Sequence, residues 1–218
     1  MTENLPPILR FVLLAVAAYA CGALPWGLWI GRWFRGVDIR TIGSGNLGAT
    51  NVYRSLGPAL GVLTLLLDVA KGAVPLAIGA PLLVGTSDPF LLETGRVVAG
   101  IAAVAGHVWT FLAGFKGGKG VATTVGVLLA LSPAAFGIFV GVFVLTLAVT
   151  RYVSLGSTLG AIAFAVALWR LQPAGIRSPA FVLGVVLALL ILVRHRENYA
   201  RLARGEERRF SLRGGKAA

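Results

Sequence analysis

The sequence has few charged residues and very little cysteine. Charged residues make up 13% of the 218 residues, whereas a soluble domain of this length carries about 25%. The single cysteine, Cys21, excludes an intrachain disulfide. Residues 18–20 weakly resemble a lipoprotein cleavage site, but the apolar run continues past Cys21, so we expect no cleavage there.

Charge is absent from three long stretches of the chain. Residues 11–31, 97–115 and 121–150 hold no lysine, arginine, aspartate or glutamate. About 20 apolar residues cross a bilayer as a helix. The runs also lack the polar–apolar alternation of a barrel strand. The sequence therefore predicts an all-α integral membrane protein.

The candidate membrane spans follow the apolar runs. They are residues 9–31, 58–80, 96–114, 121–150, 153–169 and 179–193. The fourth is either one long helix or two short ones, 121–131 and 134–150, because Ser132-Pro133 lies in its middle and proline breaks helices.

Lysine and arginine favour the two short helices. Seven spans with the N-terminus outside place 15 basic residues in the cytoplasm and four outside, whereas six spans give eight and 11. Cytoplasmic segments are enriched in basic residues. We therefore expect seven transmembrane helices, one pair of them short, in a single domain over 1–218 that ends in a basic cytoplasmic tail, 194–218. The net charge of +12 then indicates an anionic membrane face and not a nucleic acid.

A first polar segment, TIGSGNLGATNVYRSLG, covers residues 41–57. It carries one fixed cation, Arg54, and glycines that let the backbone turn its N–H groups toward a ligand. Its neutral hydrogen-bonding side chains are Ser44, Asn46, Thr50 and Asn51. Both an anion-binding loop and an ordinary polar loop with a helix cap fit this composition.

A second segment, GFKGGKGVATT, covers residues 114–124. Its lysines and glycines precede a helix that we expect to begin near Val121, and loose N–H groups, a helix N-terminus and lysines together form an anion site. A basic loop whose lysines reach lipid headgroups is the alternative. The segment is no Walker A loop, because Lys119 is followed by Gly120 and not by serine or threonine.

A third segment, RHRENYARLARGEERRF, covers residues 194–210. His195 and Asn198 are three residues apart, so we expect them to share a helix face beside Arg194. The alternative is a basic membrane anchor without a site.

Asp68, Lys71 and His107 fall within the expected spans. Asp68 and Lys71 are three residues apart and predict a structural ion pair, since lone charges in a membrane are costly. Two roles are open for His107: a hydrogen bond between helices, or a place in the site.

Several familiar reaction centres are missing from the sequence. It has no Gly-x-Ser-x-Gly elbow and no paired aspartates for a metal. Leu112 and Ala200 stand where a His-x₄-Asp acyltransferase signature would need aspartate. Three cationic segments on one membrane face therefore predict phosphate-bearing substrates held by positioning and charge neutralisation, with no metal and no cofactor.

Together the segments resemble one family closely. Residues 44–51 with Arg54, Gly106-His107 leading into 116–123, and 194–198 with Arg201-Leu202 and Gly205 resemble the bacterial acyl-phosphate:glycerol-3-phosphate acyltransferases (PlsY). The resemblance covers nearly the whole chain in order. One departure is Thr110, where the family often has proline after the Gly-His pair.

The resemblance implies a reaction. A fatty acyl group passes from acyl phosphate to the 1-hydroxyl of glycerol 3-phosphate, giving lysophosphatidic acid and phosphate, the first step of phospholipid synthesis. It implies that acyl-CoA and acyl-carrier protein are not donors, and we expect no covalent acyl-enzyme. The proton acceptor is either His195 or the donor phosphate. An organic-phosphate transporter is the alternative function, with a lipid-binding scaffold third.

The candidate site residues fall into three groups. Catalytic roles are expected for Ser44, Arg54, Lys119, His195 and Asn198. Substrate-binding roles are expected for Gly45, Asn46, Asn51, Lys116, Gly117, Gly118, Gly120, Thr123 and Arg194. Structural roles are expected for Asp68, Lys71, His107 and Glu207, the last from the resemblance.

The expected surroundings follow from the same reasoning. The partners are the two substrates and membrane lipids, and docking of a soluble acyl-phosphate-producing phosphate acyltransferase on the basic tail is an open question. The expected location is the bacterial inner membrane, with the site at its cytoplasmic face.

Overall fold

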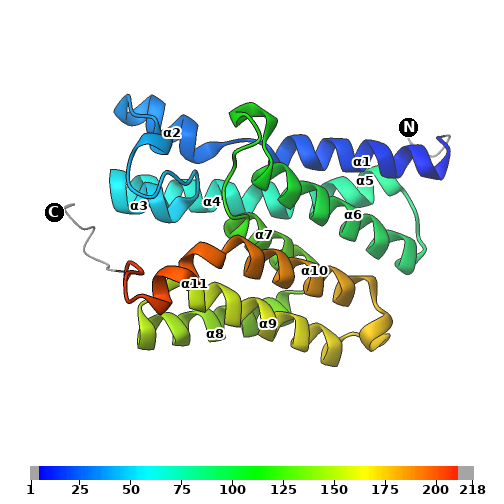
Figure 1. Ribbon diagram of the computed structural model, residues 1–218. Helices are drawn as coiled ribbons and strands as arrows, with labels where there is room; N and C mark the ends of the chain where they lie inside the picture. Colours follow the sequence, from blue (N-terminus) through cyan, green and yellow to red (C-terminus); the bar gives the residue numbers. More distant parts are fainter. Residues whose placement is uncertain (1–4, 211–218) are drawn as a thin grey trace. The chain divides into compact units, whose positions relative to one another are not determined.

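The computed structural model describes residues 5–210, and every regular element in that range is helical. The described chain forms two compact units, residues 5–130 and residues 131–210, and each is considered by itself (Figure 1). The all-helical membrane fold expected from the sequence is confirmed.

The first unit holds the N-terminal helices and two polar connections between them. Its elements are α1 (Pro7–Gly22), α2 (Trp26–Arg35), η1 (Ile39–Thr41), α3 (Ala49–Leu56), α4 (Pro58–Val74), the π-helical turn η2 (Pro75–Gly79), α5 (Ala80–Val84), α6 (Pro89–Val108), η3 (Phe111–Ala113) and α7 (Val121–Leu131).

Glycines let the helices of this unit approach closely. A Cβ on Gly22 of α1 would overlap the backbone of α6, and one on Gly106 of α6 would overlap the backbone of α1. Gly72 and Gly126 allow the same approach between α4 and α7. Such contacts are typical of membrane helices, which associate through packing of small residues.

The first expected span, 9–31, is interrupted, which the sequence reading missed. Helix α1 ends at Gly22 and α2 begins only at Trp26, after Pro25. The carbonyls of Ala23 and Leu24 therefore lie outside the helices. They accept hydrogen bonds from Thr110 Oγ1 and, at 2.7 Å, from Lys71 Nζ. The break thus supplies two acceptors for buried polar groups.

The second unit is built from α8 (Pro133–Thr150), α9 (Val153–Leu171), η4 (Gly175–Arg177), α10 (Pro179–Arg194) and α11 (Arg196–Ala203). The break expected at Ser132-Pro133 is confirmed: Ser132 Oγ accepts a hydrogen bond from the N–H of Ala135, and proline occupies the first turn of α8. Helix α9 packs against both α8 and α10, as Figure 1 shows.

The membrane-crossing capacity of the described residues can be read from helix length and composition. Five segments are long and apolar enough: Pro7–Arg35, Pro58–Val84, Pro89–Ala113, Pro133–Thr150 and Val153–Leu171. A sixth is added if α10 and α11, which are bent by 51°, count as one, and α7 is shorter. Each expected span contains helix, the first one as α1 and α2 with a break between them, and the number of seven spans stays a prediction.

Candidate functional site

The loop before α3 is organised by one buried amide. Asn51 is 4% exposed, and its Oδ1 accepts the N–H of Ser44 at 2.9 Å. Its Nδ2 lies within 3.2 Å of the carbonyls of Ile39, Ile42 and Asn46. The amide is therefore committed to the loop backbone, so Asn51 shapes the loop and leaves little of its side chain for a substrate.

The groups that Asn51 arranges differ in exposure. Ser44 and Gly45 are exposed, while Asn46 is half-buried and its Oδ1 accepts the N–H of Gly48 at 2.8 Å. Gly45 has φ +68°, a left-handed conformation that favours glycine. Arg54 lies half-buried in the last turn of α3. The loop thus carries the exposed Ser44 hydroxyl, and α3, which follows it, carries Arg54.

Two arginines near this loop are already paired. Asp38 Oδ2 lies 2.6 Å from Arg40 and 3.0 Å from Arg32. Hydrogen bonds from Arg40 and Arg32 hold the pKa of Asp38 well below its usual range. The charges of Arg32 and Arg40 are thus partly neutralised by Asp38 within the chain.

The glycine loop folds back onto the end of α6. Gly114 and Phe115 have φ of +67° and +59°, so the chain reverses direction there. The N–H of Gly117 then donates to Val108 at 3.1 Å, and the N–H of Gly118 donates to His107 at 3.2 Å. The sequence had predicted loose N–H groups that face a ligand. That prediction is wrong for these two N–H groups, because both are bonded within the chain.

Glycine is needed at positions 117 and 118 because a side chain would not fit there. A Cβ on Gly117 would overlap the carbonyl oxygen of His107, and one on Gly118 would overlap the ring of His107. The groups near the loop that are suited to bind an anion are therefore the exposed Lys116, the half-buried Lys119 and the first turn of α7. N–H groups of a first helical turn have no acceptor within the helix.

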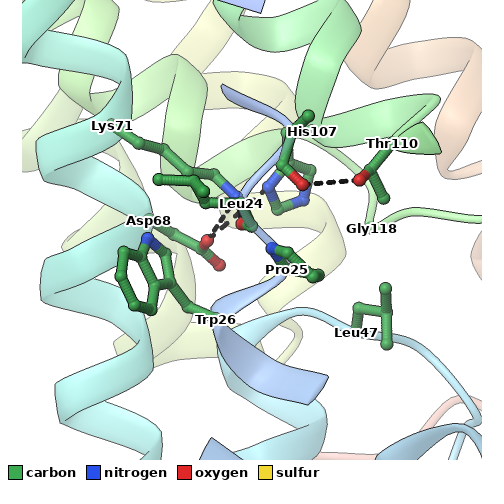
Figure 2. Close-up of a pocket in the computed structure, with 10 residues that line it drawn as sticks. Leu24, Pro25, Trp26, Leu47, Asp68, Lys71, His107, Thr110 and Gly118 are labelled. Atoms are coloured by element: carbon green, nitrogen blue, oxygen red, sulfur yellow. Dashed lines mark hydrogen bonds and ion pairs between the residues drawn. The ribbon is translucent and has the colours of Figure 1, made fainter. Parts of the chain in front are cut away.

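A buried polar network lies behind this loop (Figure 2). Lys71 Nζ is 2.8 Å from Asp68 Oδ1, and both side chains are almost fully buried. His107 Nδ1 lies 3.7 Å from the same carboxylate oxygen and 3.0 Å from Thr123 Oγ1. Lys71 also donates a hydrogen bond to the carbonyl of Leu24, in the break between α1 and α2. The network therefore connects that break with α4, α6 and α7.

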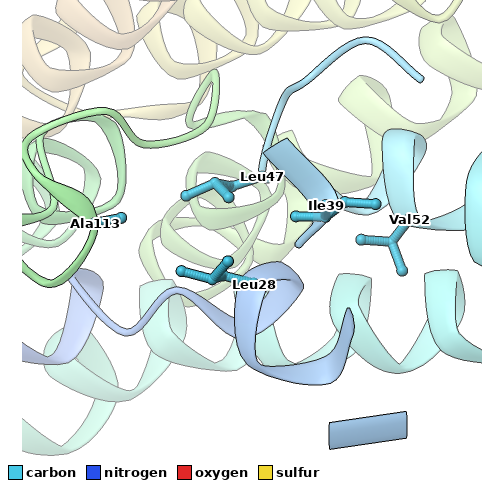
Figure 3. Packing of buried hydrophobic residues seen from close by; sticks show 5 residues of the cluster. All are labelled: Leu28, Ile39, Leu47, Val52 and Ala113. Carbon is cyan, nitrogen blue, oxygen red and sulfur yellow. The ribbon is translucent and has the colours of Figure 1, made fainter. Parts of the chain in front are cut away.

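The first two polar segments meet inside the first unit. Leu47 from the first segment packs in one buried cluster with Leu28, Ile39, Val52 and Ala113, the residue before Gly114 (Figure 3). Leu47 and Gly118 also line one small cavity of about 10 Å³ beside the buried network. The first two polar segments therefore lie close together in this unit, and their common membrane face stays a prediction.

The third segment has its own network in the second unit. Glu207 Oε1 accepts hydrogen bonds from Asn198 at 2.6 Å and from Ser154 at 3.2 Å, and Oε2 accepts one from Arg201 at 2.9 Å. Burial raises the pKa of Glu207, but the hydrogen bonds from Asn198 and Arg201 and the charge of Arg201 outweigh it and bring the pKa below its ordinary value. Glu207 is therefore a charged anchor for Asn198.

His195 lies at the junction of two helices. It is 3% exposed and stands between α10 and α11. The spacing had predicted one helix for His195 and Asn198, but Asn198 lies in α11 and His195 precedes it. Its Nδ1 is 2.9 Å from the carbonyl of Ile191, which requires a proton on Nδ1. Nε2 is then the basic nitrogen of the neutral ring. Arg194, half-buried, is the last residue of α10.

Sequence reasoning missed the hydroxyls that support this segment. Thr158 Oγ1 bonds to the hydroxyl of Tyr199, and Ser154 bonds to Glu207. Ser154 and Thr158 are four residues apart in a mostly apolar helix that also contains Ser157, and all three are buried. That spacing of polar residues on one helix face was the available signal.

The expected basic tail is partly folded. The N–H of Phe210 donates to the carbonyl of Arg151 at 2.7 Å, and the guanidinium of Arg209 lies 5.8 Å from the ring centre of Tyr152. Residues 211–218, with Arg213 and Lys216, lie outside the described residues.

Comparisons with known proteins point to one family. The family model described as "Glycerol-3-phosphate acyltransferase" matches residues 12–205. A glycerol-3-phosphate acyltransferase of Geobacter sulfurreducens is 44% identical, covering 93% of this chain and 99% of its own. One of Anaeromyxobacter dehalogenans is 43% identical, covering 94% and 98%.

Solved structures agree with the sequence relatives. The crystal structure of PlsY, an integral membrane glycerol 3-phosphate acyltransferase, in its glycerol 3-phosphate form is 39% identical with a TM-score of 0.81, covering 92% of this chain and 96% of its own. Its lysophosphatidic acid form is 38% identical with a TM-score of 0.79, covering 92% and 95%. The chain therefore belongs to the glycerol-3-phosphate acyltransferase family.

Proposed function

We propose that this protein transfers a fatty acyl group from acyl phosphate to the 1-hydroxyl of glycerol 3-phosphate, giving lysophosphatidic acid and inorganic phosphate. The names of its relatives and the two ligand forms of PlsY support the acceptor and the product. The acyl-phosphate donor is inferred from the motif resemblance and from the charge of the site.

The observation that carries the proposal is the meeting of two polar loops in one unit. Lys116, Lys119 and the first turn of α7 provide cations and helix N–H groups for the phosphate of glycerol 3-phosphate. Ser44, on the loop that Asn51 holds, and Arg54, in α3, are assigned to the acyl phosphate. Both substrates are anions, so one site must neutralise two phosphates.

The chemistry then needs no covalent enzyme intermediate. The 1-hydroxyl oxygen attacks the acyl carbonyl carbon, a new C–O ester bond forms, and the C–O bond to phosphate breaks. Arg54 and the hydroxyl of Ser44 stabilise the negative charge on the carbonyl oxygen. The hydroxyl proton passes either to Nε2 of His195 or to the phosphate that leaves. Asn198, held by Glu207, positions a substrate group.

The surroundings of the site are part of the proposal. Seven spans with the N-terminus outside place all three polar segments at the cytoplasmic face of a bacterial inner membrane, where soluble glycerol 3-phosphate meets an acyl donor in the lipid. The basic residues Arg208 and Arg209 are exposed and suit docking of an acidic surface on a soluble enzyme that makes acyl phosphate. Activity that is unchanged by salt and by neutralising both arginines would contradict this docking.

The donor is tested with the purified protein in lipid vesicles. Glycerol 3-phosphate is supplied with palmitoyl phosphate or, in parallel, with palmitoyl-CoA. Lysophosphatidic acid is expected from palmitoyl phosphate alone and is expected to be lost in Lys119→Ala. Product from the thioester would refute the donor assignment.

The proton acceptor is tested by His195→Ala at saturating substrates. A positioned general base contributes about 100-fold or more to kcat. A loss of that size assigns the proton to His195, whereas a loss of only a few-fold assigns it to the donor phosphate.

A further inference from the structure

His107 contacts both ends of the segment that carries Lys119. Upstream, its carbonyl accepts the N–H of Gly118 at 3.2 Å. Downstream, its Nδ1 lies 3.0 Å from Thr123 Oγ1, in the first turn of α7. Lys119 and Gly120 lie between these two attachments. One residue near the end of α6 therefore holds both ends of this segment, the loop end through its backbone carbonyl and the start of α7 through its ring.

The ring also fills the space under the loop. A Cβ on Gly118 would overlap Nε2 of His107, so the backbone rests directly on the imidazole edge. His107 is 5% exposed and Thr123 is 0% exposed, which keeps water away from the contact between them. A shift of the ring toward Gly118 would have to move the loop, because the loop backbone already rests against the imidazole.

The ring itself is held from behind. Asp68 Oδ1 lies 3.7 Å from His107 Nδ1 and 2.8 Å from Lys71 Nζ. Lys71 in turn donates to the carbonyl of Leu24 at 2.7 Å. The chain of contacts runs from the break between α1 and α2, through α4, to the imidazole, and Figure 2 shows it within one small region.

We infer that His107 is a positioning residue for the anion site: it sets the place of Lys119 and of the α7 N-terminus through Gly118 and Thr123. This inference rests on the proposed function, in which that loop binds glycerol 3-phosphate. Loss of the contact should weaken binding of glycerol 3-phosphate and leave the chemical step on bound substrate largely intact.

The test compares His107→Phe, which keeps a ring without nitrogen, with a change of the residue that the nitrogen contacts. We expect His107→Phe to raise the KM for glycerol 3-phosphate at least about tenfold and to change kcat less than about threefold. Thr123→Val, which removes the hydroxyl that Nδ1 contacts, should shift KM in the same direction.

A double variant separates positioning from direct binding. If Thr123 acts through His107, the variant with both changes should be no worse than His107→Phe alone. Additive effects would mean that Thr123 acts on the substrate independently of His107, and they would overturn the inference. Thr64→Val is the matched control, because Thr64 is equally buried but its hydroxyl bonds only within α4, to Leu60 at 2.8 Å.

The remaining outcomes are also decisive. Where His107→Phe does not fold, Thr123→Val is compared with Thr64→Val, and equal KM values for these two variants would refute the inference. If Lys119→Ala loses product or raises KM while neither His107→Phe nor Thr123→Val raises KM, the positioning role fails and the loop assignment stands. If Lys119→Ala leaves KM unchanged in protein that makes product, the loop assignment itself fails.

Discussion

Asn198 Nδ2 lies 2.6 Å from Glu207 Oε1, and this contact fixes which way the Asn198 amide faces. The amide nitrogen points to the carboxylate, so the carbonyl oxygen Oδ1 faces away from it as an acceptor. Ser154 and Arg201 hold the same carboxylate from two other directions. Glu207 thus determines the orientation of a side chain assigned to the site.

We predict that Glu207→Gln destabilises the protein and lowers its activity. The Glu207 side chain is 6% exposed and accepts three hydrogen bonds, and a glutamine must replace one acceptor oxygen with a donor. The loss should be about 2 kcal/mol of unfolding free energy. Glu206→Gln is the control, because the Glu206–Arg204 pair is more than half exposed, and such pairs contribute about 1 kcal/mol at most. Thermal unfolding in detergent measures both, and equal shifts would contradict the prediction.

The same carboxylate predicts how stability depends on pH. The pKa of Glu207 lies below its ordinary value of 4.5, so its contribution is complete above that value and is lost as the pH falls through the lower, folded-state pKa. The Tm of the unmodified protein should therefore fall more steeply than that of Glu207→Gln between pH 5 and lower values. Asp38 has a pKa shifted in the same direction, so both are measured in an Asp38→Asn background. Parallel curves would count against the assignment.

Gly117→Ala and Gly118→Ala should each raise the KM for glycerol 3-phosphate. Each new Cβ would overlap His107, at its carbonyl oxygen or at its ring, so the loop has to move. The matched control is Gly141→Ala in α8, where a Cβ meets nothing within 4 Å and the backbone is not left-handed. Steady-state kinetics on all three provides the test, and an unchanged KM in the loop variants would show that the overlap is relieved without moving Lys119.

The buried ion pair of Asp68 and Lys71 should be strongly coupled. Removing one partner leaves the other charge buried without its counter-ion, so Asp68→Asn or Lys71→Gln alone should cost about 3 kcal/mol. The double variant should lose clearly less than the sum of the two single losses. Thermal unfolding of the three variants tests this, and additive losses would show that the pair is not a unit.

Much of the fold could be predicted because its signals are local. The uncharged runs predicted the helices, and Ser132-Pro133 together with the basic-residue distribution predicted that 121–150 is two helices. The break at residues 23–25 was missed because no charge interrupts the run there, although Pro25 was a visible signal. The carbonyls that the break releases matter only once Lys71 and Thr110 lie beside them.

The site was predictable in composition and less so in geometry. Glycines and lysines indicated an anion loop, but whether Gly117 and Gly118 offer N–H groups or only lack a side chain depends on His107, which lies about ten residues away along the chain. The support of Asn198 depends on Ser154, more than 40 residues earlier, and on a helix junction at His195. Such long-range contacts leave no local pattern in a single sequence.

The central claim is tested most directly by the stoichiometry of the reaction in vesicles. Purified protein is reconstituted, given palmitoyl phosphate and glycerol 3-phosphate, and followed by ³¹P NMR together with the distribution of glycerol 3-phosphate across the membrane. The account predicts one inorganic phosphate for each lysophosphatidic acid formed and no net movement of glycerol 3-phosphate. Uptake of glycerol 3-phosphate without lysophosphatidic acid would contradict it and would indicate a transporter.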